Sequence, residues 1–339
     1  MRVPKPRNLD RRFVSARMLW PGIPLAMTLL LCAAPPAISF PISNGTEYAL
    51  WPSTPPGSAG VSLTETVKDD GKDSVNDPQR IISGIATPTI RAFIPARPNG
   101  AAAVITAGGG YTSLVIDKEG TDIAKWLNSI GITAFVLKNR LPGEGHADGS
   151  NVPLQDGQRA IRLVRSNAAE WGIDPKRIGI VGLSSGGHMA SMIGTSYDRK
   201  VYAPVDAGDA ISARPDFMIL AYGPHSSNAR QYLLNPAQAP VPPPQKQALY
   251  DEYPTDRQVT KDTPPAFLMH TDEDNRVDPR NSVRFYMALK EAGIPAELHI
   301  FKDGLHGVAI RNAKGLPVAA WTTLAEEWLI ASGVIKKPQ

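Results

Sequence analysis

One serine of the sequence has the surroundings that a catalytic nucleophile needs. Ser184 lies at the centre of the turn Gly182-Leu-Ser-Ser-Gly186, between a branched apolar run at 178–181 and a helix expected to begin near Gly187. Turns of this kind hold the middle residue in a strained backbone conformation, which the neighbouring glycines accommodate. Short Gly-Ser patterns are common in loops, so the strand before the turn and the helix after it carry the prediction. We therefore expect the Ser184 hydroxyl to stand free at the carboxyl end of a buried strand.

A serine hydroxyl attacks a carbonyl only when a base takes its proton, and that base is usually a histidine oriented by a carboxylate. Among the six histidines, only His306 lies in a Gly-x-His-Gly turn, and this turn follows the last expected strand. We predict that His306 is the base. The other five are expected as follows: His146 and His225 in loops near the site, where a substrate contact stays open, His188 facing neighbouring loops, His270 in a structural role and His299 packed within a strand.

The acid of such a triad is expected in the segment 270–278, which contains four carboxylates after the penultimate strand. Asp274 has an Asp-x-x-Val setting before a helix led by proline, so we predict Asp274, with Asp272 as its competitor. A solvated acidic loop is the simpler interpretation, and a calcium loop would need a glycine that is missing here. The resulting chain order, Ser184 then Asp274 then His306, is that of α/β-hydrolases.

A glycine turn at 108–110 follows an apolar strand and has its own chemical use. Attack on an ester carbonyl creates an oxyanion, which needs N–H donors already in place. We predict that Gly109 or Gly110 supplies one donor and that the backbone N–H of Ser185 supplies the other. Tyr111, which ends the turn, is a candidate substrate contact. The alternative use, binding a phosphate, lacks both the Gly-x-Gly-x-x-Gly and the Gly-Lys-Ser/Thr patterns.

Strands and helices alternate along the rest of the chain at the spacing of crossover connections. This order predicts a mostly parallel central sheet covered by helices on both faces. The strands are expected at 81–85, 89–94, 101–107, 133–138, 178–181, 217–222, 266–270 and 297–301, and the helices at 122–130, 154–169, 279–292 and 319–331.

The domain organisation follows from the same pattern. Residues 80–335 form the predicted catalytic domain, and residues 41–79, rich in Pro, Ser, Gly and Asp, are a lead-in that either follows the surface or is loose. The segment 235–247 contains five prolines, so no regular structure is expected in it. It is either a lid or pocket wall at the site or a surface insertion, and the sequence leaves both open.

The overall composition is that of an ordinary globular protein. Of the 339 residues, 42% are hydrophobic and 20% are charged. A chain of this length can bury the core of one large α/β domain. The formal charge of +4 comes largely from the basic cluster within residues 1–17, and the remainder is close to neutral. The basic balance therefore gives no reason to expect a nucleic-acid partner.

The amino terminus has the layout of an export signal. A basic flank precedes an uncharged stretch from Met18 to Phe40 with an apolar centre, and small residues follow. A retained membrane anchor is the alternative, but four prolines in the stretch argue against a continuous helix. We therefore expect residues 1–40 to be a signal peptide and the mature protein to be periplasmic or secreted, with no stable membrane partner. Cys32 is the only cysteine, so the mature chain would have no disulfide and no thiolate metal site.

With these residues identified, the chain resembles bacterial α/β-hydrolases of the carbohydrate-esterase kind, the group of acetylxylan esterases and BD-FAE-type feruloyl esterases. The resemblance covers about 88–330. The motifs that carry it are Gly108-Gly-Gly-Tyr111, Glu119-Gly120 with Ala124-Lys-Trp-Leu127, Val136-Leu-Lys-Asn-Arg-Leu-Pro142, Pro153-Leu-Gln-Asp156 with Arg159-Ala160, Gly182-Leu-Ser-Ser-Gly-Gly-His188, Asp262-Thr-Pro-Pro265, Asn281-Ser282 and His306-Gly307. Many relatives have Ala at the position of Ser185 and Tyr at the position of Asn139. The first change keeps the N–H donor, and the second alters the pocket wall.

The resemblance implies an exported serine esterase that removes acetyl or other short acyl groups from a carbohydrate of the xylan type, with no metal and no organic cofactor. Its partner would be a small-molecule or polysaccharide ester. A serine peptidase or a general short-chain carboxylesterase is the alternative, although related peptidases usually carry a large extra domain. A binding protein that kept the fold without catalysis is a third hypothesis. Assays with ester and peptide substrates would separate the three.

Overall fold

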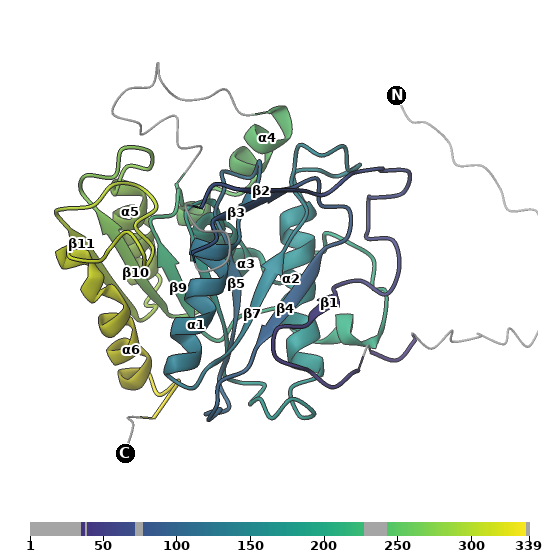
Figure 1. The fold of residues 1–339 in the computed structure, drawn as a ribbon, viewed down its shortest axis with the longest axis horizontal. Coiled ribbons are helices and arrows are strands. Elements are labelled where there is room, and N and C mark those ends of the chain that lie inside the picture. The colour runs from purple at the N-terminus through teal and green to yellow at the C-terminus, as the bar shows by residue number, and fades with distance from the viewer. Residues whose placement is uncertain (1–34, 38, 72–76, 227–242, 337–339) are drawn as a thin grey trace, which may run out of the picture. The chain divides into compact units, whose positions relative to one another are not determined.

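An eight-stranded sheet organises the chain (Figure 1). The computed structural model describes residues 35–37, 39–71, 77–226 and 243–336. In sheet order, the strands are β1 (Glu47–Ala49), β4 (Thr89–Phe93), β7 (Thr133–Lys138), β5 (Ala102–Thr106), β8 (Ile178–Leu183), β9 (Met218–Ala221), β10 (Ala266–Thr271) and β11 (Ala296–Phe301). From β7 to β11 every neighbouring pair is parallel, whereas β4 is antiparallel to both β1 and β7. The predicted mostly parallel sheet is confirmed.

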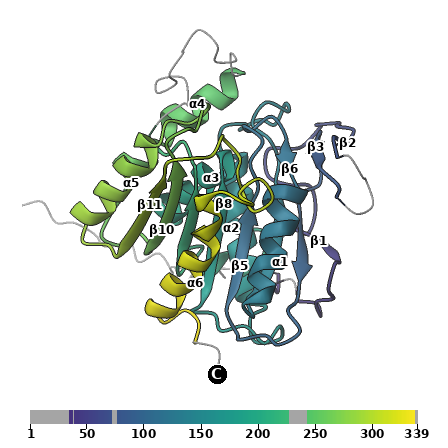
Figure 2. The ribbon, with the colours of Figure 1, turned by 60° about the vertical axis from the view of Figure 1, so that its left-hand side comes forward.

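Helices cover both faces of this sheet, as Figure 2 shows with α1 and α6 on one side and α2 and α3 on the other. The helices are α1 (Asp122–Ser129), α2 (Val152–Ser166), α3 (Ser185–Ser196), α4 (Pro244–Glu252), α5 (Arg280–Glu291) and α6 (Trp321–Ala331). The central strands β5, β8 and β10 are buried along their whole length. Their sequences are continuous apolar runs, because helices cover both faces of the parallel sheet and side chains on both faces are buried.

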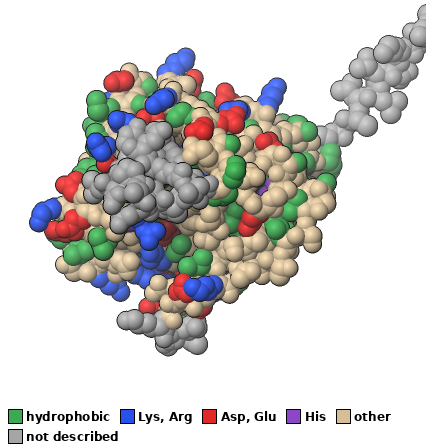
Figure 3. Space-filling model, turned by 90° about the horizontal axis from the view of Figure 1, so that it is seen from above, with side chains coloured by type: hydrophobic (Ala, Val, Ile, Leu, Met, Phe, Trp, Pro, Cys, Tyr) green, Lys and Arg blue, Asp and Glu red, His purple; other side chains and the backbone are tan. Residues whose placement is uncertain are grey.

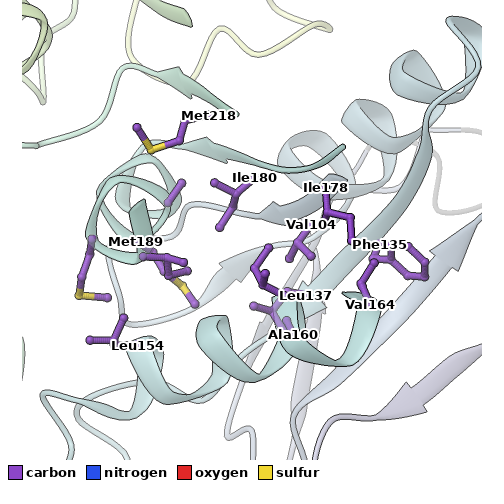
Figure 4. Packing of buried hydrophobic residues seen from close by; sticks show 14 of the residues in the cluster. Val104, Phe135, Leu137, Leu154, Ala160, Val164, Ile178, Ile180, Met189 and Met218 are labelled. Carbon is purple, nitrogen blue, oxygen red and sulfur yellow. The ribbon is translucent and has the colours of Figure 1, made fainter. Parts of the chain in front are cut away.

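Two hydrophobic layers result, one on each face of the sheet. Figure 4 shows the layer under α2, where Leu154, Ala160 and Val164 meet side chains of β5, β7 and β8. Complete burial of one such aliphatic side chain contributes about 1.5–3 kcal/mol. The layers therefore hold the strands in a fixed register, and their carboxyl ends form a rigid edge for a site.

The lead-in is more ordered than its composition indicated. Within 41–79 the chain forms β1, and it also forms β2 (Thr66–Asp69), which joins β3 (Arg80–Ser83) and β6 (Leu114–Val115) in a small second sheet. Leu50 and Trp51 are buried in the main core, and the Trp51 indole N–H donates to Asp156 over 2.8 Å. The lead-in thus contains two short strands that its composition did not predict, β1 paired with the edge of β4 and β2 paired with β3.

Two helix starts also differ from the sequence prediction. Helix α4 begins at Pro244, inside the proline-rich segment that we expected to lack regular structure. Proline is accepted at the first position of a helix, since the N–H it lacks would have no partner there. The other start is that of α3, which begins directly after the serine at Ser185 and not near Gly187. Residues 235–242 lie outside the described residues, as do residues 1–34 and 38 of the signal peptide expected at 1–40. Among those described, no helix combines the length and apolar character needed to cross a membrane.

Candidate active site

The turn at Ser184 requires two places where backbone segments lie very close together. Ser184 follows the last residue of β8 and has φ 54° and ψ −126°, a strained conformation for a residue with a side chain. A Cβ atom at Gly186 would lie 2.0 Å from the Thr106 carbonyl oxygen, and one at Gly182 would lie 2.2 Å from the Gly186 carbonyl oxygen. Only glycine fits at both positions, so the sharp strand-to-helix turn depends on them.

The structure brings Ser184, His306 and Asp274 into one hydrogen-bonded line. Ser184 Oγ lies 2.8 Å from His306 Nε2, and His306 Nδ1 lies 2.7 Å from Asp274 Oδ2. A carboxylate accepts, so Nδ1 carries the ring hydrogen and Nε2 is left to accept the serine proton. Three residues that are far apart in the sequence therefore meet in the arrangement that nucleophilic acyl transfer requires.

Asp274 is fixed by donors on both carboxylate oxygens. Oδ1 accepts the backbone N–H groups of Arg276 and Val277 at 2.9 and 2.8 Å, and Oδ2 faces His270 Nε2 at 3.2 Å as well as His306. Burial alone would raise the pKa of Asp274, but the hydrogen bonds from His270 and His306 outweigh it and hold the pKa well below its ordinary value. The competitor Asp272 is exposed, whereas Asp274 is buried.

His270 supports the acid from behind. It is fully buried, and its Nε2 also lies 2.9 Å from the carbonyl oxygen of Val277. This nitrogen therefore carries the hydrogen and shares it between that carbonyl and Asp274. The other ring nitrogen lies 2.8 Å from Ser282 Oγ and accepts its hydroxyl hydrogen. The sequence assigned His270 a structural role, and these contacts show which group it holds.

The predicted oxyanion donors divide into two groups. The N–H of Gly110 donates to Ser185 Oγ over 2.9 Å, so it is already used inside the protein. The backbone N–H groups of Gly109, which has φ +133°, and of Ser185 donate no hydrogen bond within the described part of the chain. Gly109 and Ser185 therefore remain the candidate donors, and Gly110 instead fastens the turn.

The hydroxyl group of Tyr111 points into the protein interior. Its hydroxyl lies 2.9 Å from His188 Nδ1, and His188 Nε2 donates to the carbonyl oxygen of Tyr253 over 2.8 Å. The Tyr111 side chain is buried, so its hydroxyl is not offered to a substrate. Burial lowers the pKa of His188 to about 4 against the opposing hydrogen bond to Tyr253, so this histidine is neutral at pH 7.

The two histidines expected near the mouth of the site are also buried. His225 Nδ1 lies 2.9 Å from Ser191 Oγ, and because its ring is buried it does not offer the substrate contact that the sequence left open. His146 lies 3.0 Å from Ser58 Oγ and lines a cavity of about 300 Å³ together with lead-in residues such as Trp51 and Thr54. No side chain of the hydrogen-bonded line lines this cavity.

Charge is mixed on the face seen from above in Figure 3. Basic and acidic side chains of the described residues are interspersed there, and they do not form a single basic stripe.

Sequence reasoning missed the arrangement behind the glycine turn. Glu119 was noted only as part of a shared motif, yet its buried carboxylate accepts the N–H of Gly108 over 2.9 Å and the hydroxyl of Tyr222 over 3.2 Å. The signal available was an acidic residue shortly after the glycine turn and close to apolar residues 114–116. Its contacts depend on the tertiary fold, so the sequence did not reveal them.

Comparisons with known proteins agree with this geometry. The BD-FAE family model matches residues 102–289. The acetylxylan esterase of Xylanibacter ruminicola is 34% identical over 63% of this chain and 42% of its own length, and endo-1,4-beta-xylanase B of Butyrivibrio fibrisolvens is 31% identical over 62% and 32%. The chain thus spans less than half of either relative. The acetyl ester-xyloside bifunctional hydrolase of Caldicellulosiruptor lactoaceticus superposes with a TM-score of 0.67 and 33% identity over 87% of this chain and 98% of that one. By sequence and by structure, therefore, the chain belongs to the BD-FAE family of α/β-hydrolases.

Proposed function

We propose that this protein is a serine carboxylic-ester hydrolase that removes acetyl or other short acyl groups from carbohydrate substrates. The observation that carries the proposal is the hydrogen-bonded line from Ser184 through His306 to Asp274, with contacts of 2.8 and 2.7 Å. The line lies at the carboxyl edge of a buried sheet, beside two backbone N–H groups without a partner among the described residues. That combination is what acyl transfer requires.

Acylation begins when Ser184 Oγ attacks the ester carbonyl carbon and its proton passes to His306 Nε2. The carbonyl oxygen becomes an oxyanion, which accepts hydrogen bonds from the N–H groups of Gly109 and Ser185. Asp274 stays ionised and stabilises the imidazolium through Nδ1. His306 then gives the proton to the departing alcohol oxygen, the carbon–oxygen bond to the alcohol breaks, and the acyl group remains on Ser184.

Deacylation repeats these steps with water. His306 takes a proton from a water molecule, the hydroxide attacks the acyl carbon, and a second oxyanion uses the same donors. The proton returns to Ser184 Oγ as its bond to the acyl carbon breaks, which releases a carboxylic acid.

The substrate class rests on the relatives. One carries the name acetylxylan esterase, and a solved structure of similar length is an acetyl ester-xyloside bifunctional hydrolase. An acetylated xylose-containing saccharide is therefore the substrate we expect here. Cleavage of the glycosidic bond itself normally uses two carboxylates across a sugar, and the proposed chemistry uses a serine.

We also propose that the protein is exported to the periplasm or beyond. The basic flank and uncharged stretch within residues 1–40 support this proposal. Export would place the enzyme where polysaccharide esters occur. Mass spectrometry of the mature amino terminus after expression in a bacterial host would test it, since a retained Met1 in the cytosolic fraction would contradict export.

A hydrolysis panel tests the activity itself. The purified protein should hydrolyse p-nitrophenyl acetate and release acetate from acetylated xylan, with lower rates on butyryl and feruloyl esters and none on an aryl xyloside. Ser184→Ala should lower kcat by at least about 10³-fold, because the attacking oxygen is lost. Ser332→Ala, at an exposed position, is the matched control and should retain full activity. Unchanged ester hydrolysis by pure Ser184→Ala protein would refute the proposal.

A further inference from the structure

A buried carboxylate beside the reacting groups has no role in the steps above. Glu119 lies on a π-helical turn, η1 (Asp117–Thr121), and only 3% of its surface is exposed. Among the described residues, no nitrogen of Lys, Arg or His lies within 4.0 Å of its oxygens in an ion pair. A buried carboxylate without a cation is costly, so its neighbours must satisfy it through hydrogen bonds.

The two donors to Glu119 come from opposite sides of the site. Gly108 N–H donates to Oε2 over 2.9 Å, and this residue opens the turn that contains Gly109. The hydroxyl of Tyr222 donates to Oε1 over 3.2 Å. The backbone N–H of Ala309, in the loop that contains His306, opposes the rise in the pKa of this hydroxyl that its burial causes. Glu119 therefore connects the glycine turn to the loop of the base through one tyrosine.

The connection runs close to the reacting atoms. A Cβ atom built on Gly108 would lie 2.3 Å from Glu119 Oε2 and 2.7 Å from Ser184 Cβ, so little space separates the carboxylate from the nucleophile. On the other side, the Tyr222 ring packs edge-on against the His306 ring, with centroids 5.3 Å apart. Tyr222 also has φ +41°, a strained backbone that its surroundings must hold.

The turn that carries Glu119 is itself firmly anchored. Asp117 is buried and accepts both the backbone N–H and the guanidinium of Arg80, with contacts between 2.7 and 2.9 Å. Gly120 lies against β7, where an added Cβ would come within 2.9 Å of Val136 Cγ1. The backbone on both sides of Glu119 is therefore fixed by contacts with Arg80 and β7.

We propose that Glu119 is a positioning residue that sets the distance between the oxyanion donors and the base. The inference rests on the esterase mechanism above and adds a residue to it. Glu119 holds Gly108 so that the next N–H, that of Gly109, faces the oxyanion, and through Tyr222 it holds the His306 loop in register with that donor. Acyl transfer is sensitive to such placement, and a misplacement of about 1 Å can cost about 10²-fold in rate.

Four variants test the connection with p-nitrophenyl acetate. Glu119→Ala should lower kcat by about 10²-fold, and Tyr222→Phe, which keeps the ring, by about 10-fold, both with KM within about twofold. Glu119→Gln keeps an acceptor for Gly108 and should restore kcat to within about fivefold of the wild type. Glu119→Ala/Tyr222→Phe should be no slower than Glu119→Ala alone, because both changes break the same connection. Glu327→Ala and Tyr286→Phe are the controls away from the site.

A second readout separates this inference from the proposed function. The rate at which a fluorophosphonate labels Ser184 requires the nucleophile, the base and the oxyanion donors but no particular ester, and it should fall in parallel with kcat. If the wild type labels rapidly but hydrolyses no ester, the ester assignment fails and the labelling rates still test Glu119. Wild-type kcat and labelling in folded Tyr222→Phe, multiplicative losses in the double variant, or a loss confined to KM would each overturn the inference. Should Glu119→Ala fail to fold, Tyr222→Phe and Glu119→Gln decide it.

Discussion

At the scale of single residues, the reaction depends on which hydrogen each nitrogen of His306 carries. Asp274 accepts from Nδ1, so Nε2 is free to take the Ser184 proton. Oδ1 of Asp274 is occupied by two backbone N–H groups, so only Oδ2 faces the two histidines. The carboxylate therefore selects the tautomer as well as the orientation of the base.

Asp274→Asn should reverse that selection. The amide oxygen would stay on the two backbone N–H groups, and the NH₂ group would face Nδ1, so the ring hydrogen would move to Nε2 and point at the serine. We expect kcat for p-nitrophenyl acetate to fall by about 10³–10⁴-fold. Asp272→Asn, two residues away and exposed, should stay within about twofold of the wild type. Equal losses in the two variants, or a loss only for Asp272→Asn, would show that the acid is misassigned.

The sequence predicted the residues of this line because each lies in a local pattern at the end of a strand. Parallel strands bring their carboxyl ends to one edge, so three local patterns are enough to predict convergence. The role of Gly110 could not be predicted in the same way. Its N–H is taken by the hydroxyl of Ser185, and that contact depends on how closely the two turns approach in the folded chain.

At the scale of elements, buried histidines tie α3 to the segments that pack against it. His188 on α3 bonds to Tyr111 after β5 and to Tyr253 after α4. His225, after β9, bonds to Ser191 on α3. Burial lowers the pKa of both imidazoles, to about 4 for His188 and well below 6.5 for His225. Both are neutral when folded at pH 7.

Acid should therefore weaken the fold through these elements. Between pH 6.5 and about 4 the unfolded chain binds a proton at His188 that the folded chain does not, so the free energy of unfolding falls as the pH falls. Above pH 6.5, His188 does not lower the free energy of unfolding. Near pH 4 it lowers the free energy of unfolding by about 3 kcal/mol, at 1.36 kcal/mol for each pH unit. His188→Gln should flatten this dependence in urea unfolding curves measured at pH 7.0, 5.5 and 4.5.

The slope of stability against pH is the readout, so a general loss of stability in the variant does not obscure it. Met287→Gln, at an exposed position of α5, removes no titratable group and is the control that should keep the wild-type slope. A His188→Gln protein with the wild-type slope would contradict the assignment of a buried neutral imidazole.

At the scale of the whole molecule, the lead-in is part of the hydrolase fold. The buried guanidinium of Arg159 donates to the carbonyl oxygen of Leu50, and the guanidinium groups of Arg140 and Arg159 lie 5.8 and 5.6 Å from the centre of the Trp51 ring. The sequence predicted the sheet, its helices and their order because long apolar runs indicate buried strands. It did not predict β1, because three residues that pair with a strand edge leave no periodic pattern, and proline and serine dominate the composition around them.

In the whole molecule we expect a single reactive serine. Labelling the full chain with a fluorophosphonate, followed by intact mass and peptide mapping, measures this directly. We expect one adduct per chain, on Ser184, and a loss of esterase activity in proportion to the labelled fraction. Complete labelling of Ser184 with activity retained, or inactivation with the adduct on another residue, would show that Ser184 is not the nucleophile.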